Sequence, residues 1–239
     1  MTRITVILAA VLSFMAFTPL VAQDYQKGYD AYQAGDYATA IQEWTPLAVQ
    51  GDAAAQYLLG KVYYFGHGVP QDHAEAVRLW RLSADQGLTM AQTDMGFMYR
   101  NGEGVSQDYA EAVKWWRLAA EPEYFEGSTD AQLQLGFMYY YGLGVLQDYA
   151  ESVRLWGLAA DQGNSDAQNN LGAMYAKGEG VFQDKVIAYM WYDIGAANGN
   201  GQSGTSRNTI AEQMNPYAVE QAQAMARECM SSNYQNCGY

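Results

Sequence analysis

Residue types that commonly do chemistry in proteins are few and scattered in this chain. It contains two histidines and two cysteines among 239 residues, and it has no Ser-x-x-Lys, Gly-x-Ser-x-Gly or His-Glu-x-x-His motif. These spacings would support a serine nucleophile paired with lysine, a hydrolase nucleophile turn or a zinc-binding helix. The sequence therefore predicts no catalytic residue, no metal site and no cofactor.

Two weaker signals have ordinary structural explanations. Gly199, Gly201 and Gly204 fit the spacing G-x-G-x-x-G, which binds a dinucleotide only between a strand and a helix. Here the motif follows a helical pattern, so a flexible linker is favoured over a cofactor site. His67 and His73 flank one loop without a second ligand at helical spacing, and we expect solvated surface side chains.

The two cysteines lie close together near the end of the chain. Cys229 and Cys237 are separated by seven residues. In an oxidising compartment such a pair predicts a disulfide that ties the C-terminal tail to its last helix. A metal site is the alternative, but neither histidine is near the pair in sequence.

The first 22 residues resemble an export signal. Arg3 precedes an apolar run over residues 4–17, and residues 19–22 (Pro-Leu-Val-Ala) form a signal-peptidase site. We expect cleavage after Ala22 and a periplasmic or secreted chain without a membrane span. An uncleaved membrane anchor is the alternative, although the apolar run is short for a spanning helix.

The charge balance narrows the class of partner. Acidic residues outnumber basic ones by 26 to 13, which gives a formal net charge of −13. Phosphates and anionic lipids repel such a chain, so we expect no nucleic-acid partner. With 49% hydrophobic residues the chain is nevertheless expected to fold.

The elements that position these residues come from an internal repeat. The loop Gly-Val-x-Gln-Asp occurs four times, and its offsets of 36, 40 and 36 residues mark a repeat array. It covers residues 68–72, 104–108, 144–148 and 180–184. Each unit reads as two helices, in which the loop Asp and a Glu three residues later form a capping box. The first helix opens at Thr or Ser three residues before a recurring Gln, and glycines end it.

A glycine recurs inside each first helix, opposite a column of small residues on the second helix. These glycines of the first helices are Gly60, Gly96, Gly136 and Gly172. Because glycine costs about 1 kcal/mol within a helix, we expect it to allow close approach of the two backbones.

The repeat A-x-x-x-L-G-x-x-Y-x-x-G-x-G-V-x-Q-D resembles the Sel1-like repeat, a relative of the tetratricopeptide repeat. The resemblance implies an all-α fold: a right-handed α-solenoid of antiparallel helix pairs, with about a dozen helices in a monomer. After the signal peptide we expect a shortened helix pair, four repeats and degenerate capping helices that carry the cysteines. The boundaries are 1–22, 23–52, 53–88, 89–128, 129–164, 165–200 and 201–239.

The resemblance also implies a function. Sel1-like proteins serve as scaffolds for protein contacts, so we expect a scaffold or regulator that binds a partner protein or peptide in its concave groove. The alternative is a cell-envelope hydrolase or β-lactam-binding protein, like a cysteine-rich branch of the family. That branch carries a cysteine pair in each repeat, and this chain has none inside its repeats.

The variable columns of the first helices predict the binding face. They recur at i, i+4 and i+7, share one helix face and are rich in aromatic residues. The candidates for partner binding are Tyr57, Lys61, Tyr64, Phe97, Arg100, Phe137 and Tyr140. Their alternative role is packing between repeats.

An insertion predicts a second contact. The stretch 121–128 breaks the period and adds Glu123, Tyr124 and Phe125 to a loop that is otherwise short. Insertions in repeat proteins map to loops on one face, often a binding face, although surface loops also tolerate neutral insertions.

Overall fold

The computed structural model describes residues 24–121, 127–234 and 237, which form twelve α-helices and no strand. The predicted leader and the predicted contact loop at 123–125 lie outside these residues. The helices are α1 (Tyr25–Gln33), α2 (Tyr37–Val49), α3 (Ala53–Phe65), α4 (His73–Ala84), α5 (Thr89–Asn101), α6 (Tyr109–Ala120), α7 (Thr129–Tyr141), α8 (Tyr149–Asp161), α9 (Ser165–Lys177), α10 (Lys185–Ala197), α11 (Gly201–Ala211) and α12 (Pro216–Ser231). None of these described helices is long and apolar enough to cross a membrane.

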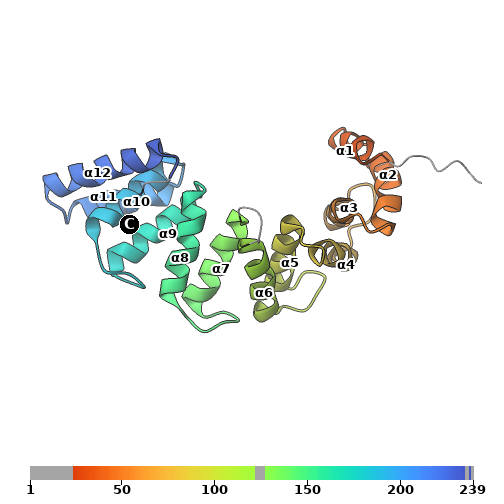
Figure 1. Cartoon of the computed structure of the whole chain (residues 1–239), viewed down its shortest axis with the longest axis horizontal. Helices are drawn as coiled ribbons and strands as arrows, with labels where there is room; N and C mark the ends of the chain where they lie inside the picture. The colour runs from red at the N-terminus through yellow and green to blue at the C-terminus, as the bar shows by residue number, and fades with distance from the viewer. Residues whose placement is uncertain (1–23, 122–126, 235–236, 238–239) are drawn as a thin grey trace, which may run out of the picture.

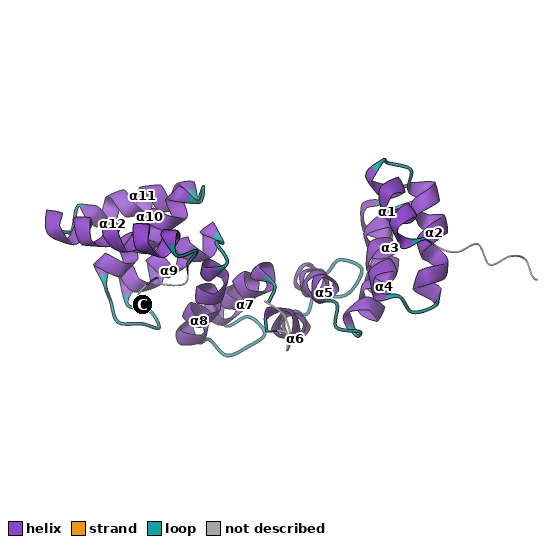
Figure 2. Ribbon diagram, turned by 45° about the horizontal axis from the view of Figure 1, so that its top comes forward, coloured by secondary structure: helices purple, strands orange, loops and turns teal. Residues whose placement is uncertain are grey.

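The helices pack in chain order, which confirms the predicted all-α solenoid of helix pairs. Each helix contacts the next one along the chain, except that α12 packs on α10. Figure 1 shows the pairs following one another along an open arch from α1–α2 to α11–α12, and Figure 2 shows the same helical array from a second direction. The first helices of neighbouring pairs also touch, as α5 touches α7 and α9 touches α11. Because the inner side of a curved array is the shorter one, these contacts place the first helices along the inside of the arch.

The core is a series of neighbouring clusters along the arch. Each centres on an aromatic residue of a second helix, and Trp44, Trp116 and Trp191 are fully buried. The indole nitrogen of Trp116 donates to the backbone oxygen of Thr93 at 3.1 Å, and Trp156 does the same to Leu133. The indoles of Trp116 and Trp156 therefore tie the second helix of a pair to its first helix.

These indoles explain the helical glycines and correct one expectation. A Cβ on Gly96 would lie 2.2 Å from the Nε1 of Trp116, and one on Gly136 would lie 2.4 Å from that of Trp156. The glycine makes room for a tryptophan ring, and the nearest atoms do not belong to the backbone of the small-residue column.

The predicted capping boxes form only in part. Asp72 caps α4 by accepting from the backbone N–H of Glu75 at 3.0 Å. Glu75 does not reach back to the cap and instead pairs with Arg78 one turn later. The first helices begin at the predicted Thr or Ser, but the capping residue is the one before it: Ser128 caps α7 and Asn164 caps α9.

The recurring glutamines join successive helix pairs. Each is buried and donates its amide to the last turn of the preceding second helix; Gln92, for example, donates to the Ala84 oxygen at 3.2 Å. Helix ends leave carbonyl groups without partners, so a buried end requires such a donor. These glutamines therefore link each repeat to the preceding helix pair by a buried hydrogen bond. The set is Gln56, Gln92, Gln132 and Gln168.

The C-terminal tail folds back on the last repeat. The sulfurs of Cys229 and Cys237 lie 1.97 Å apart, so the predicted pair is at disulfide distance. The Tyr234 hydroxyl accepts from the Asn198 amide at 2.8 Å, and its ring lies 3.4 Å from the position of a Cβ on Gly163. The tail thus covers the turns that follow α8 and α10.

Candidate protein-binding groove

The seven predicted contact residues lie on the three central first helices. Tyr57, Lys61 and Tyr64 come from α3, Phe97 and Arg100 from α5, and Phe137 and Tyr140 from α7. All seven are half-buried. The predicted residues therefore lie on first helices, and part of each side chain remains accessible.

The aromatic members of this set also belong to the packing between helices. The Phe97 ring meets Trp116 edge-on with centroids 5.4 Å apart, and Phe137 meets Trp156 at 5.3 Å. Both rings therefore take part in the packing between helices, the alternative role that the sequence left open. Each ring has one face in the core and leaves only part of its surface for a partner.

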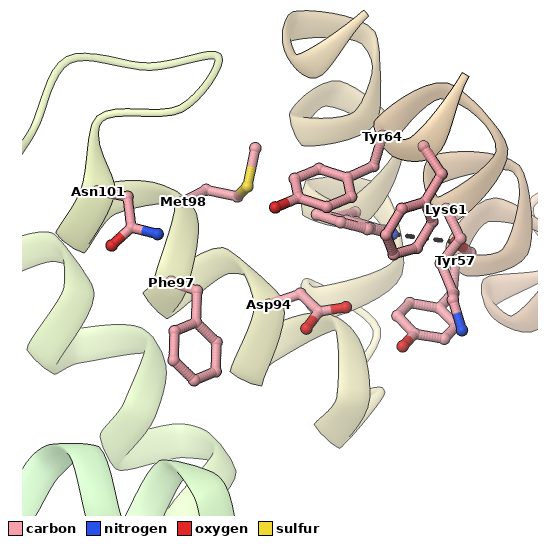
Figure 3. Close-up of a pocket in the computed structure, with 9 residues that line it drawn as sticks. Tyr57, Lys61, Tyr64, Asp94, Phe97, Met98 and Asn101 are labelled. Carbon is pink, nitrogen blue, oxygen red and sulfur yellow. Dashed lines mark hydrogen bonds between the residues drawn. The ribbon is translucent and has the colours of Figure 1, made fainter. Parts of the chain in front are cut away.

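A pocket of about 340 Å³ opens between α3 and α5. Figure 3 shows Tyr57, Lys61 and Tyr64 on the α3 side and Phe97, Met98 and Asn101 on the α5 side. The Asp94 carboxylate extends between the two sets toward α3. Phe65 and Trp80 complete the lining.

A second pocket of about 620 Å³ lies between α5 and α7. Arg100 and Phe137 line it together with Tyr141, and Asn101 lines both pockets. Arg100 donates to the Gln134 oxygen at 2.5 Å and lies over the Phe97 ring. Asn101, at the C-terminal end of α5, therefore lies between the two pockets, and we call the two together the inner groove.

Two of the predicted tyrosines connect neighbouring repeats. The Tyr64 hydroxyl donates to Glu103, and the Tyr140 hydroxyl donates to Glu179, both at 3.0 Å. Tyr140 lines neither pocket, so of the predicted residues it is the one whose visible role is this contact between repeats.

The electrostatics of the inner groove centre on Asp94. Burial raises the pKa of Asp94 to about 6, against the opposing effects of the Tyr57 hydroxyl and the Lys61 ammonium. The charge of Asp130 raises it further. Burial also raises the pKa of Tyr57 above its ordinary value, so that side chain stays neutral.

Sequence reasoning missed several residues that line the groove. Phe65, Asp94, Asn101 and Tyr141 lie outside the columns predicted as the binding face. One signal was present for Asp94. Its column holds Leu58, Asp94, Gln134 and Asn170, so only one repeat carries a charge there.

The two histidines are not the solvated residues expected from sequence. His67 stacks on Tyr37 with ring centroids 4.5 Å apart, and its Nδ1 lies 3.0 Å from the Tyr32 hydroxyl. His73 stacks on Tyr64 at 4.9 Å. Both histidines are half-buried and contact side chains of neighbouring helices. The described residues contain no group of three or more His, Cys, Asp or Glu that could bind a metal ion.

Stacked helix pairs with a groove along the inner side define the class of α-solenoid scaffolds. Within that class, the Sel1 repeat family model matches residues 53–88, 89–121, 129–164 and 165–200, and the chain belongs to this family. Proteins of this family generally act as scaffolds for protein–protein interaction and typically lack catalytic activity.

Two solved structures are similar over most of the chain. A Sel1 repeat protein from Oxalobacter formigenes is 27% identical, with a TM-score of 0.71 over 90% of this chain and 93% of that one. The protein c5321, a protective antigen of uropathogenic Escherichia coli strains with an SLR fold, is 31% identical, with a TM-score of 0.68 over 89% of this chain. The match spans 54% of c5321. Among curated proteins, none matches the chain.

Proposed function

We propose that this protein is an exported scaffold that binds one partner protein of the cell envelope along its inner groove. The observation that carries the proposal is the pair of adjoining pockets between α3, α5 and α7, lined by aromatic side chains. Aromatic residues in partly enclosed pockets contribute much of the binding energy at protein interfaces. The family provides the general role, and the groove provides the surface.

The groove offers exposed apolar area as well as half-buried rings. Phe65 lines the first pocket and is 51% exposed, while Tyr141 lines the second and is 62% exposed. Such side chains add contact area for a partner without first having to leave the core. They are therefore better probes of binding than Phe97 or Phe137, whose truncation would also remove core packing.

The first experiment distinguishes binding in the groove from non-specific binding through exposed aromatic residues. Oxidised protein is used as bait for envelope extract, and captured proteins are quantified by mass spectrometry. Phe65→Ala with Tyr141→Ala should weaken capture of the enriched partner by about fivefold or more, which corresponds to about 1 kcal/mol. The matched control is Phe182→Ala with Tyr217→Ala, which removes one exposed Phe and one exposed Tyr outside the groove.

Equal loss of capture in both double variants would contradict the groove as the binding surface. A wild-type bait that enriches no protein over a bead control would contradict the scaffold function itself. Helical circular dichroism of every variant confirms that folding is retained.

Export forms part of the same proposal, and it rests on the apolar leader and the cysteine pair. Intact mass of the protein from a periplasmic or culture fraction should correspond to a chain that starts at Gln23 with both thiols oxidised. Recovery of the full-length chain in the membrane fraction would instead favour a retained anchor.

A further inference from the structure

The wall of the first pocket carries a carboxylate that the repeat does not require. The equivalent positions of the other repeats hold Leu58, Gln134 and Asn170, so the fold accepts an uncharged residue there. Asp94 is half-buried, and within the described residues it forms no ion pair. A buried acid without a paired cation is costly, and proteins tend to keep such groups where a ligand supplies the missing charge.

The surroundings of Asp94 suit a flat organic cation. Tyr57, Tyr64 and Phe97 line the same pocket, whose volume of about 340 Å³ is many times that of one water molecule. Aromatic faces attract cations, and a guanidinium can in addition stack on a ring. Figure 3 shows the Asp94 carboxylate between these rings, on the side that faces α3.

The charge around the pocket is negative on balance. Glu103 accepts from Tyr64 at the pocket wall, and Asp130 is close enough to raise the pKa of Asp94. Against these three carboxylates stand two cations: Lys61, whose charge acts on Asp94, and Arg100, which lies over the Phe97 ring. The chain as a whole carries a formal charge of −13. A basic partner is therefore attracted both at long range and at the pocket.

We propose that this pocket binds an arginine side chain of the partner, with the guanidinium paired to Asp94 and stacked against the groove aromatics. This inference rests on the proposed function and specifies the chemistry of the partner. Arginine fits better than lysine because its fork of N–H donors can satisfy both carboxylate oxygens, and because it is less strongly hydrated.

Lys61 does not occupy the place of that guanidinium. Its ammonium lies over the Tyr57 ring, 5.9 Å from the centroid, and in the described part of the chain it forms no ion pair with Asp94. The ammonium lowers the pKa of Asp94 but does not bring it back to the ordinary range. Removing Lys61 should therefore strengthen the binding of an arginine, because one repulsive charge is lost and no bond is broken.

The test uses capped tripeptides as probes of the single side chain. The chain is labelled with nitrogen-15 and titrated with acetyl-Ala-Arg-Ala-amide, with the citrulline peptide as a neutral isostere, and with the lysine peptide. The arginine peptide should shift amide signals of α3 and α5, and the citrulline peptide should bind about tenfold more weakly. Asp94→Asn should cause a similar loss for arginine, whereas Lys61→Met should not weaken it.

Two further variants control for loss of folding and for a general effect of removing a negative charge. Asp94→Gln places in α5 the residue that α7 carries at the same position, and it should lose arginine binding while keeping the helical spectrum. Glu220→Gln removes one exposed charge on α12 and should leave binding unchanged. Equal binding of the arginine and citrulline peptides, or unchanged binding by both Asp94 variants, would overturn the inference, and tighter binding of lysine would overturn the choice of arginine.

The same variants separate this inference from the proposed function. If wild-type and Asp94→Asn baits capture the partner equally and the peptides do not bind, the scaffold stands and the arginine pocket is refuted. If the wild-type bait captures no partner while the arginine peptide binds at α3 and α5, the pocket stands and the scaffold function is refuted.

Discussion

At the scale of single residues, close contacts explain positions that composition alone makes puzzling. Glycine is a poor helix former, yet it recurs in the middle of each first helix. An aromatic ring of the paired second helix, an indole in the first three repeats and that of Tyr192 in the fourth, occupies the volume where a Cβ would lie. The local cost to the helix is therefore offset by a buried tryptophan with a satisfied N–H group.

Gly136→Ala should destabilise the protein although alanine favours the helix. The new Cβ would lie 2.4 Å from the Trp156 ring, and overpacking of this kind costs about 1–3 kcal/mol. We expect a net loss of about 2 kcal/mol, or a melting temperature lower by about 4–8 °C. Gly204→Ala in α11 is the control, since its Cβ would meet only Ala196 at 3.8 Å. A stabilised Gly136→Ala protein would contradict the packing role.

The ionisation of Asp94 should make stability depend on pH. Its pKa is raised to about 6 in the folded protein from about 3.9 in an unfolded chain, so the folded state holds the proton more tightly. The cost of ionisation is therefore absent below about pH 4, grows between pH 4 and 6 and stays constant above that range. Tyr57, Lys61 and Asp130 are the groups that set this shift together with burial.

Asp94→Asn should accordingly be more stable than the wild type at pH 7.5, by an amount on the order of 2 kcal/mol. The difference should vanish near pH 4, where both side chains are neutral. Urea unfolding at the two pH values measures it, and a carbon-13 titration of the Asp94 carboxyl measures the pKa directly. A variant that is less stable than the wild type at pH 7.5 would show that the carboxylate is well paired in the fold.

At the scale of helices, the structure depends on how each end is satisfied. Glycines in the left-handed conformation end α3, α5, α7 and α9. The loop glutamine after each of these helices donates to a carbonyl of its last turn, as Gln71 does to Tyr64 at 2.7 Å. At the end of α12 the backbone N–H of Tyr234 donates to the Cys229 carbonyl at 2.9 Å, and Cys229 is paired with Cys237.

Replacing both Cys229 and Cys237 with serine should loosen the last helix selectively. The bridge closes a loop with a sequence separation of eight, so its removal should cost about 2 kcal/mol or less. Amide hydrogens of α12 should exchange faster, because Tyr234 would no longer be held against Asn198. The amides of α3 to α8 provide the internal reference, and unchanged exchange in α12 would refute the role of the bridge.

At the scale of the whole molecule, the arch lacks a single centre. Among the described residues, three core clusters each draw their buried residues from three consecutive helices, and a fourth extends from α7 to α12. In such an array, stability is approximately the sum of repeat terms and nearest-neighbour terms. A destabilising substitution in one repeat should therefore affect mainly that repeat and its neighbours.

Trp44→Ala tests this property at the N-terminal end. Trp44 is fully buried between α1, α2 and α3, and truncating such a residue costs about 3–5 kcal/mol. We expect faster amide exchange in α1, α2 and α3 and unchanged exchange in α9 to α12. Uniformly faster exchange along the whole chain would mean that the arch unfolds as one unit.

The sequence by itself determined the repeat, the helix pairs and most of the loops. In a solenoid the stabilising contacts join repeats that are neighbours in the chain. The residues that make these contacts therefore recur with the repeat period, as Gln56, Gln92, Gln132 and Gln168 do. It also selected the inner columns, since Tyr57, Lys61, Tyr64 and Phe97 line one pocket, and Arg100 and Phe137 line the next.

Only the tertiary structure decided how much of each side chain remains available to a partner. The curvature of the arch results from small rotations between successive repeats. The sequence period does not reveal the size of those rotations. They place Phe97 partly beneath its neighbours, leave Phe65 and Tyr141 at the surface and bring Asp94 of one repeat opposite Tyr57 and Lys61 of another. The inner groove is therefore a property of the packed array, because its pockets lie between repeats.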